Sequence, residues 1–404
     1  MLDLVIPVGS SYNRPMNLIR EKIDQAVELL DELDLDMWLL AVRETPVMAD
    51  PTHALVVGIE VAWESFFVFT RKGDAVSLVG NFDEADFARS GNFTEVMSYT
   101  EGVSADFRKL ISRLDPKSIG VNYSLEDPSS DGLTHGMFMQ LQNHLKGTPY
   151  ADRLVSAARL TSKLRARKTS GELALLERAA IEAEKVFGRL VPQLKVGLTE
   201  IEVAEIIDRE IRACGGEPSF ETICNAGDKT EPGHGSPTTA VMEPGDLMHI
   251  DFGVLLDGYC SDIQRLVYFK RPGESAAPPE LTEAFNKVRD IITETGKITV
   301  PGKEGREIDA VAREMLIDDG YEPYQHALGH QLGRAVHDGG ALLGPEWERY
   351  GKLPCIPIEK DNVFTLELEI MLPGIGCVGL EEDVVVTDTG ARFLCPRQME
   401  LVVL

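Results

Sequence analysis

The sequence predicts an α+β protein with a smaller N-terminal α/β domain, residues 1–160, and a larger C-terminal domain, residues 161–404. Three observations support this. The first ~150 residues alternate helical and strand-like segments, as α/β domains do. A basic stretch at residues 163–168 then precedes two helices with clear start signals. Two hairpin-like segments that carry acidic residues follow in the C-terminal half.

The N-terminal elements follow from hydrophobic periodicity and turn signals. In order, we expect a helix at residues 16–34, a strand at 37–42, a hairpin of 66–71 and 75–80, and a strand at 118–123. The histidines of this half are isolated in the sequence, and a lone histidine is more often structural or exposed than a ligand. We therefore expect the chemistry to lie in the C-terminal domain.

Two helices open the C-terminal domain, and each has a capping box, in which a Thr at the N-cap is followed by a Glu three residues later. The first begins at Thr169 with Glu172, and the second at Thr199 with Glu202. Apolar residues recur at helical spacing after residue 172, and a Gly-Gly pair at 215–216 can end the second helix.

The composition excludes several classes of partner. The 40 Lys and Arg residues against 66 Asp and Glu give a formal charge of -26, which repels nucleic acids and anionic lipids. The six cysteines include no CxxC pair, which indicates a reducing compartment. No segment approaches the ~18 apolar residues of a membrane span, and residues 1–12 do not resemble a signal peptide. We expect a cytoplasmic protein with no membrane or nucleic-acid partner.

The first acidic hairpin surrounds the dipeptide Asp257-Gly258, a favoured two-residue turn. If this turn sets the register, Asp251 and Asp262 are diagonal neighbours on one face, ~7–8 Å apart at the backbone. Carboxylates at this separation can share metal ions about 3.5–4 Å apart. Two exposed aspartates on an edge hairpin are the competing interpretation. His249 is on the same face, where we expect it to pack or support rather than bind metal.

The second acidic hairpin spans residues 363–387, where glutamates interrupt aliphatic strands. Buried carboxylates need a partner such as a metal. Because strand side chains alternate, Glu381 and Glu382 point to opposite faces and only one can enter a shared site. Glu367 and Glu369 share a face, and the residues alone do not choose between them. Exposed positions on amphipathic strands are again the alternative.

Between the hairpins, three of the eight histidines fall within twelve residues: His326, His330 and His337. The spacing of the first two is that of a zinc-protease helix. No Glu follows the first histidine, however, and Gly329 and Gly333 weaken a helix. The pattern therefore predicts a cluster of histidines outside a helix.

Together these residues resemble the metal-ligand set of the pita-bread metallopeptidases, which include prolidase, aminopeptidase P, methionine aminopeptidase and the related creatinase. The matching segments are HIDFG, CSDIQR, GHQLG with VHD, FTLE and LEEDVVVT. The resemblance covers residues from about 160 to 404, and the N-terminal domain resembles that of the creatinase and prolidase branch. It implies a pita-bread catalytic domain and five metal ligands: Asp251, Asp262, His330, Glu367 and Glu381.

The resemblance also implies a chemistry, the hydrolysis of Xaa-Pro peptide bonds in small peptides by two divalent ions. One His with four carboxylates suits Mn²⁺ and tolerates Co²⁺, Fe²⁺ or Zn²⁺. Glu367 would accept the proton of the attacking water, and His337 would stabilise the developing oxyanion. His234 or His326 would orient the substrate or protonate the leaving nitrogen. We also expect a homodimer.

Two positions depart from the family pattern. Gly379 stands where Xaa-Pro peptidases usually carry Arg, which removes a cation that could hold a dipeptide carboxylate. Leu368-Glu369 replaces a common Pro-Gly pair and adds negative charge near the metals. A non-peptidase hydrolase or lyase of a small nitrogenous substrate, as in creatinase, is therefore the main alternative. A binding module without activity is a third interpretation, against which five intact ligands argue.

Overall fold

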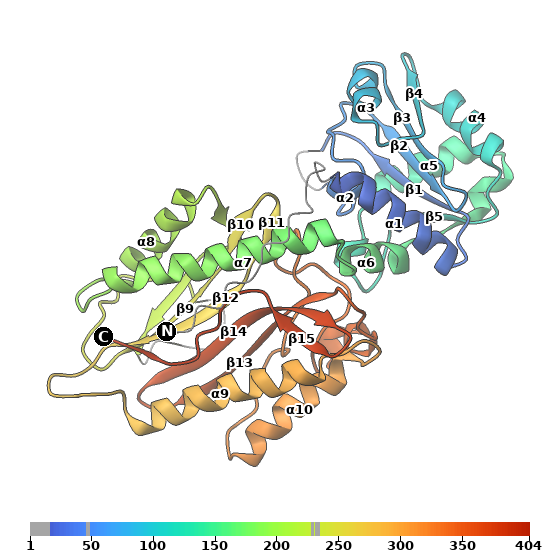
Figure 1. Cartoon of the computed structure of the whole chain (residues 1–404). Helices are drawn as coiled ribbons and strands as arrows, with labels where there is room; N and C mark the ends of the chain where they lie inside the picture. The colour runs from blue at the N-terminus through green and yellow to red at the C-terminus, as the bar shows by residue number, and fades with distance from the viewer. Residues whose placement is uncertain (1–16, 46–48, 228–229, 231–234) are drawn as a thin grey trace, which may run out of the picture.

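The computed structural model describes residues 17–45, 49–227, 230 and 235–404, and Figure 1 shows two sheet-based parts joined through α6 (Ala158–Ala166). The N-terminal part is built on a six-stranded sheet in the order β4-β3-β2-β1-β5-β6. Its strands are β1 (Met37–Val42), β2 (Ser65–Thr70), β3 (Ala75–Gly80), β4 (Glu95–Tyr99), β5 (Ile119–Val121) and β6 (Leu154–Ser156). β1–β2 and β2–β3 pair antiparallel, and the other neighbours pair parallel.

Helices cover both faces of this sheet. They are α1 (Leu18–Glu32), α2 (His53–Val56), α3 (Glu84–Ser90), α4 (Ser104–Leu114) and α5 (His135–Leu145), with 3₁₀ turns η1 (Pro128–Ser130) and η2 (Pro149–Arg153). Alternate residues of β1 enter two separate cores: Trp38 and Leu40 in one, Met37 and Leu39 in the other. All six residues of β1 are therefore buried, and β1 reads as a continuous apolar run.

The C-terminal part contains a seven-stranded sheet and a small three-stranded one. The larger has the path β13-β14-β12-β9-β8, with β15 beside β14 and β16 beside β12. Its strands are β8 (Ile223–Ala226), β9 (Leu247–Phe252), β12 (Ile263–Tyr268), β13 (Val363–Leu372), β14 (Gly376–Thr387), β15 (Gly390–Phe393) and β16 (Val402–Val403). The smaller contains β7 (Glu217–Pro218), β10 (Val254–Leu256) and β11 (Tyr259–Cys260).

Two pairs of long helices flank the larger sheet, α7 and α8 on one side and α9 and α10 on the other, as Figure 1 shows. Their bounds are α7 (Ser170–Leu190), α8 (Glu200–Ala213), α9 (Pro279–Ile298) and α10 (Gly305–Asp318), with 3₁₀ turns η3 (Val191–Gln193), η5 (Glu348–Tyr350) and η6 (Leu353–Cys355). Each pair closes its own core against the sheet. The sheet thereby lies between two helical layers, and its packed strands fix the positions of polar side chains.

The predicted elements match the observed ones closely. The strand at residues 37–42 is β1, and the helix at 16–34 corresponds to α1. Both capping boxes are present, at Thr169 with Glu172 and at Thr199 with Glu202. The predicted domain boundary at residues 160 and 161 falls inside α6, and it stays a prediction.

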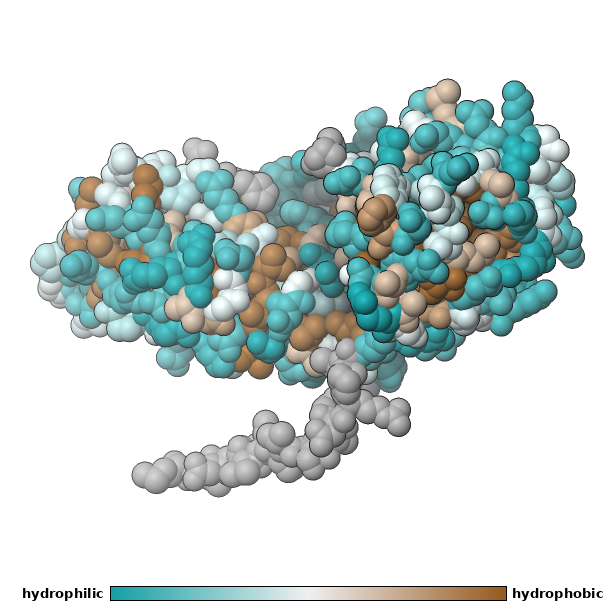
Figure 2. Space-filling view, turned by 90° about the horizontal axis from the view of Figure 1, so that it is seen from above, coloured by the Kyte–Doolittle hydropathy of each residue, from teal (hydrophilic) through white to brown (hydrophobic). Residues whose placement is uncertain are grey.

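The face shown in Figure 2 is mostly hydrophilic, with small hydrophobic areas scattered over it. No helix of the described part of the chain is both long and apolar enough to cross a membrane.

Candidate metal centre

Of the two aspartates of the first hairpin, Asp251 lies on β9 and Asp262 directly precedes β12, the adjacent strand of the larger sheet. Leu256 pairs with Tyr259 across the turn, and Phe252 pairs with Ile263 further on. The register predicted from the Asp-Gly turn is therefore confirmed on both sides of the hairpin. It puts Asp251 near the end of β9 and Asp262 just before β12, on neighbouring strands.

The second hairpin brings two glutamates to the same sheet face. Glu367 of β13 is the direct partner of Glu381 on β14. Gln264 of β12 pairs with Glu381 on one side and with Asp251 on the other. Four carboxylates thus converge from four neighbouring strand segments, because the sheet order places β13, β14, β12 and β9 side by side.

His330 reaches this face from a loop that pairs with β13. Gly329 permits the approach, since a Cβ there would lie 1.9 Å from the Thr365 carbonyl oxygen. His330 Nε2 is 3.6 Å from Asp262 Oδ2, 3.8 Å from Glu367 Oε1 and 3.9 Å from Glu381 Oε1. Residues 326–337 form no helix, as the two glycines predicted.

Of the four carboxylates, Asp262 and Glu381 are buried and Asp251 and Glu367 are partly buried. Asp251 Oδ1, Asp262 Oδ1 and Glu381 Oε1 are inaccessible and have no hydrogen-bond partner among the described residues. In the same part of the chain, no lysine or arginine forms an ion pair with any of the four. An acidic cluster of this kind costs free energy unless cations neutralise it.

The pKa values reflect the same excess of negative charge over positive charge. Burial, followed by the charge of Glu381, raises the pKa of Asp251, Asp262 and Glu367 well above their ordinary values. Burial also raises the pKa of Glu381, to about 7. The pKa of His330 is lowered instead, to about 3, because burial and the neighbouring His337 disfavour its charged form. A neutral imidazole among carboxylates is a donor set that fits divalent cations.

Gln264 and His249 support the acidic side chains, and the sequence did not single out Gln264. Gln264 Nε2 donates to Glu381 Oε2 at 2.9 Å and to Glu367 Oε2 at 3.4 Å. His249 Nε2 lies 2.9 Å from Gln264 Oε1 and holds the amide in place. A Cβ at Gly379 would lie 2.8 Å from Gln264 Oε1 and 2.9 Å from His249 Nε2. These two side chains thus fill the space that an arginine side chain at residue 379 would need to enter.

His326 pairs with Glu369, the glutamate expected to add negative charge near the metals. His326 Nε2 contacts the Glu369 carboxylate, and Nδ1 lies 2.6 Å from the Ala327 carbonyl oxygen. Burial disfavours the imidazolium, but the hydrogen bond to Glu369 and the charges of Glu367 and Glu369 outweigh burial and raise the pKa of His326 to about 9. The negative charge of Glu369 is thus offset locally.

Of the two remaining histidines, His337 lies within the described residues and His234 does not. The His337 ring lies 4.3 Å from the His330 ring, centroid to centroid, and His337 is exposed. His234, expected in the substrate site, lies outside the described residues. The alternation predicted on β14 is confirmed, because Glu382 points away from His330 and pairs with Arg265 Nη2 at 3.1 Å.

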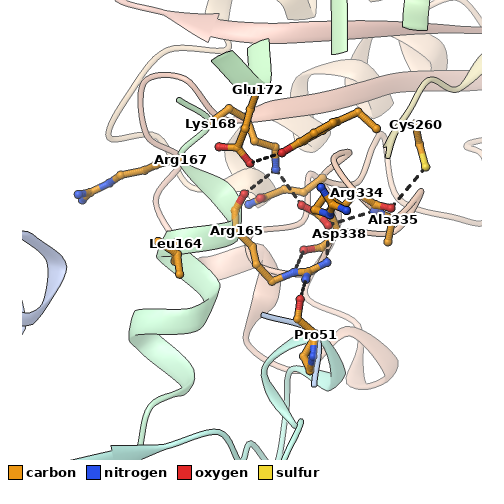
Figure 3. A network of polar contacts seen from close by, with 12 residues as sticks. Pro51, Leu164, Arg165, Arg167, Lys168, Glu172, Cys260, Arg334, Ala335 and Asp338 are labelled. Carbon is orange, nitrogen blue, oxygen red and sulfur yellow. Dashed lines mark hydrogen bonds and ion pairs between the residues drawn. The ribbon is translucent and has the colours of Figure 1, made fainter. Parts of the chain in front are cut away.

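A buried ionic network holds the loop that follows His330, and Figure 3 shows its members converging on Asp338. Lys168 Nζ lies 2.8 Å from Asp338 Oδ2, and Arg165 binds both the carboxylate and the backbone oxygen of Asp338. Arg165 also donates to the Pro51 carbonyl oxygen in the N-terminal part. Lys22 of α1 pairs with Glu172 of α7 at 2.7 Å. The network therefore fastens the N-terminal part to the His330–Asp338 loop.

Fold and site together define a two-part metallohydrolase. The family profile of metallopeptidase family M24 matches residues 174–388. The chain belongs to this family and is a hydrolase, and the pita-bread architecture is confirmed. M24 membership implies divalent metal ions, in agreement with the donor set.

Similar proteins carry related names. The uncharacterized peptidase YqhT of Bacillus subtilis is 33% identical over 253 residues, 62% of this chain and 68% of the relative. The Xaa-Pro dipeptidase of Pyrococcus horikoshii is 26% identical over 96% of this chain and all of the relative. In three dimensions, the Xaa-Pro dipeptidase from Bacillus anthracis superposes with a TM-score of 0.76 at 24% identity, covering 96% of this chain and 100% of that one.

Proposed function

We propose that this protein is a metal-dependent peptidase that hydrolyses Xaa-Pro bonds in small peptides. The observation that carries the proposal is the set of four carboxylates, two buried and two partly buried, around a neutral His330, with no compensating cation in the described residues. The relatives named Xaa-Pro dipeptidase support the substrate class. The names of the compared proteins point to peptidases and give no added weight to the creatinase-like alternative.

Asp251, Asp262, His330, Glu367 and Glu381 would hold two divalent ions, and Mn²⁺ is the metal we propose. Four carboxylates and one imidazole form an oxygen-rich set, and two ions would balance the four negative charges. When bound, such ions lower the pKa of a water and polarise the substrate carbonyl.

The chain's own residues then supply proton transfer and positioning. We propose that Glu367, whose pKa burial raises, accepts the proton of the attacking water. His326, with a pKa of about 9, carries a proton near neutral pH and could donate it to the leaving imino nitrogen. His337, beside the His330 ring, is proposed to donate a hydrogen bond to the developing oxyanion. We propose that His234 orients the substrate.

The residues around Gly379 bear on which C-terminal group of the substrate the site accepts. A dipeptide places its free carboxylate beside the imino acid, and a cation nearby would bind it through charge-assisted hydrogen bonds. Here Gly379 is covered by His249 and Gln264. The guanidinium of Arg334 packs over the Tyr259 ring, 5.2 Å from its centroid. We therefore propose that substrates without a carboxylate at this position are preferred.

The test compares kcat/KM for Ala-Pro, Ala-Pro-amide and Ala-Pro-Ala under identical Mn²⁺ loading. We expect cleavage of all three, with the amide and the tripeptide ahead of the free dipeptide. A clear preference for Ala-Pro would assign a strict dipeptidase. Failure to cleave any of them with metal bound would reject the Xaa-Pro proposal in favour of a non-peptidase substrate.

Three further features belong to the same proposal. We propose that the protein is a homodimer, and that it lies in the cytoplasm, since its free cysteines fit a reducing compartment. We also propose that residues 1–160 form the N-terminal domain and residues 161–404 the catalytic domain. Size-exclusion chromatography with light scattering tests the first of these directly.

A further inference from the structure

Four directly paired positions form a row across neighbouring strands of the larger sheet. In order, they are Glu367 on β13, Glu381 on β14, Gln264 on β12 and Asp251 on β9. Directly paired residues of antiparallel strands place their side chains on the same face. Gln264 is therefore a neutral side chain with carboxylates on both sides, at a position to which the proposed function gives no role.

The amide of Gln264 divides the oxygen atoms of the two glutamates into two sets. Its Nε2 donates to Oε2 of Glu381 at 2.9 Å and to Oε2 of Glu367 at 3.4 Å. The Oε1 atoms of Glu381 and Glu367 lie 3.9 Å and 3.8 Å from His330 Nε2. Glu381 Oε1 is also buried without a hydrogen-bond partner among the described residues. The oxygens that Gln264 does not hold thus lie beside another candidate metal ligand.

His249 fixes the direction in which this amide points. Its Nε2 lies 2.9 Å from Gln264 Oε1. An amide oxygen only accepts hydrogen bonds and an amide NH₂ group only donates them, so the oxygen faces the N–H of His249 and the NH₂ group faces the carboxylates. Gly379 leaves room for the pair, because a Cβ there would lie 2.8 Å from Gln264 Oε1 and 2.9 Å from His249 Nε2. The arrangement therefore depends on a donor, an amide and a position without a side chain.

A neutral donor suits this position better than a cation would. A lysine or arginine could also hold the glutamate oxygens, but its charge would offset part of the negative charge that attracts divalent ions. The amide of Gln264 holds the same oxygens and adds no charge. The charge of all four carboxylates is thereby left for the metal.

We propose that Gln264 is a positioning residue of the metal site, which holds Oε2 of Glu367 and Glu381 and thereby directs their Oε1 atoms toward His330. His249 sets the orientation of the amide. The inference rests on the proposed function, because it concerns the residues that would hold the metal there. Side chains that hydrogen-bond to metal ligands orient them, and replacing such a side chain typically lowers metal affinity or activity by about 10–100-fold.

Calorimetric titration of the metal-free full chain with Mn²⁺ tests the proposal. Gln264→Met removes the hydrogen bonds at similar side-chain size, and we expect about 10–100-fold weaker binding. Gly379→Ala removes no hydrogen-bonding group but crowds the amide oxygen and His249, so binding should weaken by a smaller factor. Gln398→Met is the matched control, because Gln398 binds both backbone groups of Leu266 on the same strand. It should lower the unfolding temperature and leave the Mn²⁺ affinity unchanged.

The visible absorption of the Co²⁺-saturated protein separates positioning from a general loss of structure, since it reports the number and arrangement of the ligands. We expect a changed spectrum in Gln264→Met and a wild-type spectrum in Gln398→Met. Wild-type Mn²⁺ affinity or a wild-type Co²⁺ spectrum in Gln264→Met would overturn the inference, and so would an equal loss of affinity in Gln398→Met. In these cases the proposed function stands, whereas a wild type that binds neither ion would reject both.

Discussion

Two buried groups of charged side chains flank the His330–Asp338 loop, and they differ in whether their charges are paired. In the ionic network, Asp338 is bound by Lys168 and Arg165. Burial opposes ionisation of Asp338, but the two cations outweigh burial and lower its pKa. In the metal centre, burial raises the pKa of Asp262 and nearby carboxylates add to the shift.

The difference shows what each group is for. A network whose charges are all paired inside the protein holds two parts of the chain in a fixed arrangement. A cluster that is stable only when something positive is added is a binding site for cations. Asp262 and Glu381 in one group and Asp338 in the other are all buried, so burial alone would not separate the two groups.

The largest effect is expected at Glu367, which the proposal makes both ligand and proton acceptor. Glu367→Gln should reduce kcat by at least about 10²–10⁴-fold, the usual worth of general-base help. Glu369→Gln is the matched control on the same strand face, and it should cost much less. Steady-state rates for Ala-Pro-Ala decide the ranking, and the reverse order would place the site two residues further along β13.

Asp338→Asn should destabilise the ionic network, because it removes the carboxylate that pairs with Arg165 and Lys168. It leaves Lys168 and Arg165 as buried cations without a counter-charge, which typically costs about 3–5 kcal/mol of unfolding free energy. Asp24→Asn, in an exposed ion pair with Arg20, should cost less than about 1 kcal/mol. Urea denaturation of the Mn²⁺-loaded variants measures both losses of unfolding free energy. Equal losses would show that the buried network stabilises the protein no more than an exposed ion pair does.

The two groups should respond to pH with opposite signs. Glu381 has a folded pKa of about 7 against an ordinary value of 4.5, so folding favours its protonated form. Its contribution to stability is complete below the ordinary value and is lost as pH rises through about 7. Asp338, with a lowered pKa, contributes above its ordinary value of 3.8 and loses that contribution as pH falls.

Metal should therefore stabilise the protein more as pH rises from about 4.5 to about 7. His330 adds no pH dependence to metal binding in this range, because its pKa of about 3 keeps the imidazole neutral throughout. The measurement is the unfolding temperature with Mn²⁺ and with chelator across this range. A difference that is independent of pH would contradict the raised pKa values.

The smallest effect is expected for Glu369→Gln, which should change the pKa of one group, His326. Without the carboxylate, the pKa of His326 should fall from about 9 toward its ordinary value of 6.5. Titration of the His326 ring by NMR in metal-free protein measures this. Glu64→Gln, at a carboxylate 3.1 Å from His144, is a control that should leave His326 unchanged.

Local signals were enough to predict much of this architecture. The Asp257-Gly258 turn gave the correct register, because turn geometry and the alternation of strand side chains are short-range properties. The opposite directions of Glu381 and Glu382 followed from the same alternation. The choice of Glu367 over Glu369 came from a resemblance to known sequences.

Contacts between distant segments could not be predicted. Gln264 stands between Ile263 and Arg265 in an unremarkable position, and its role depends on β12 lying next to β14. Asp338 adjoins a recognised histidine, but its partners come from residues 165 and 168, far away in the sequence. The pairing of Glu369 with His326 likewise depends on a loop path that no local pattern specifies.

The central claim is that the unpaired carboxylates hold divalent ions. Metal analysis after chelator treatment, Mn²⁺ loading and removal of free metal tests it in wild type, Asp262→Asn and Asp338→Asn. We predict two ions per chain in the wild type, fewer in Asp262→Asn because an amide is a much poorer ligand, and two in folded Asp338→Asn. A wild type that retains no metal, or an Asp262→Asn variant that retains two ions, would contradict the account.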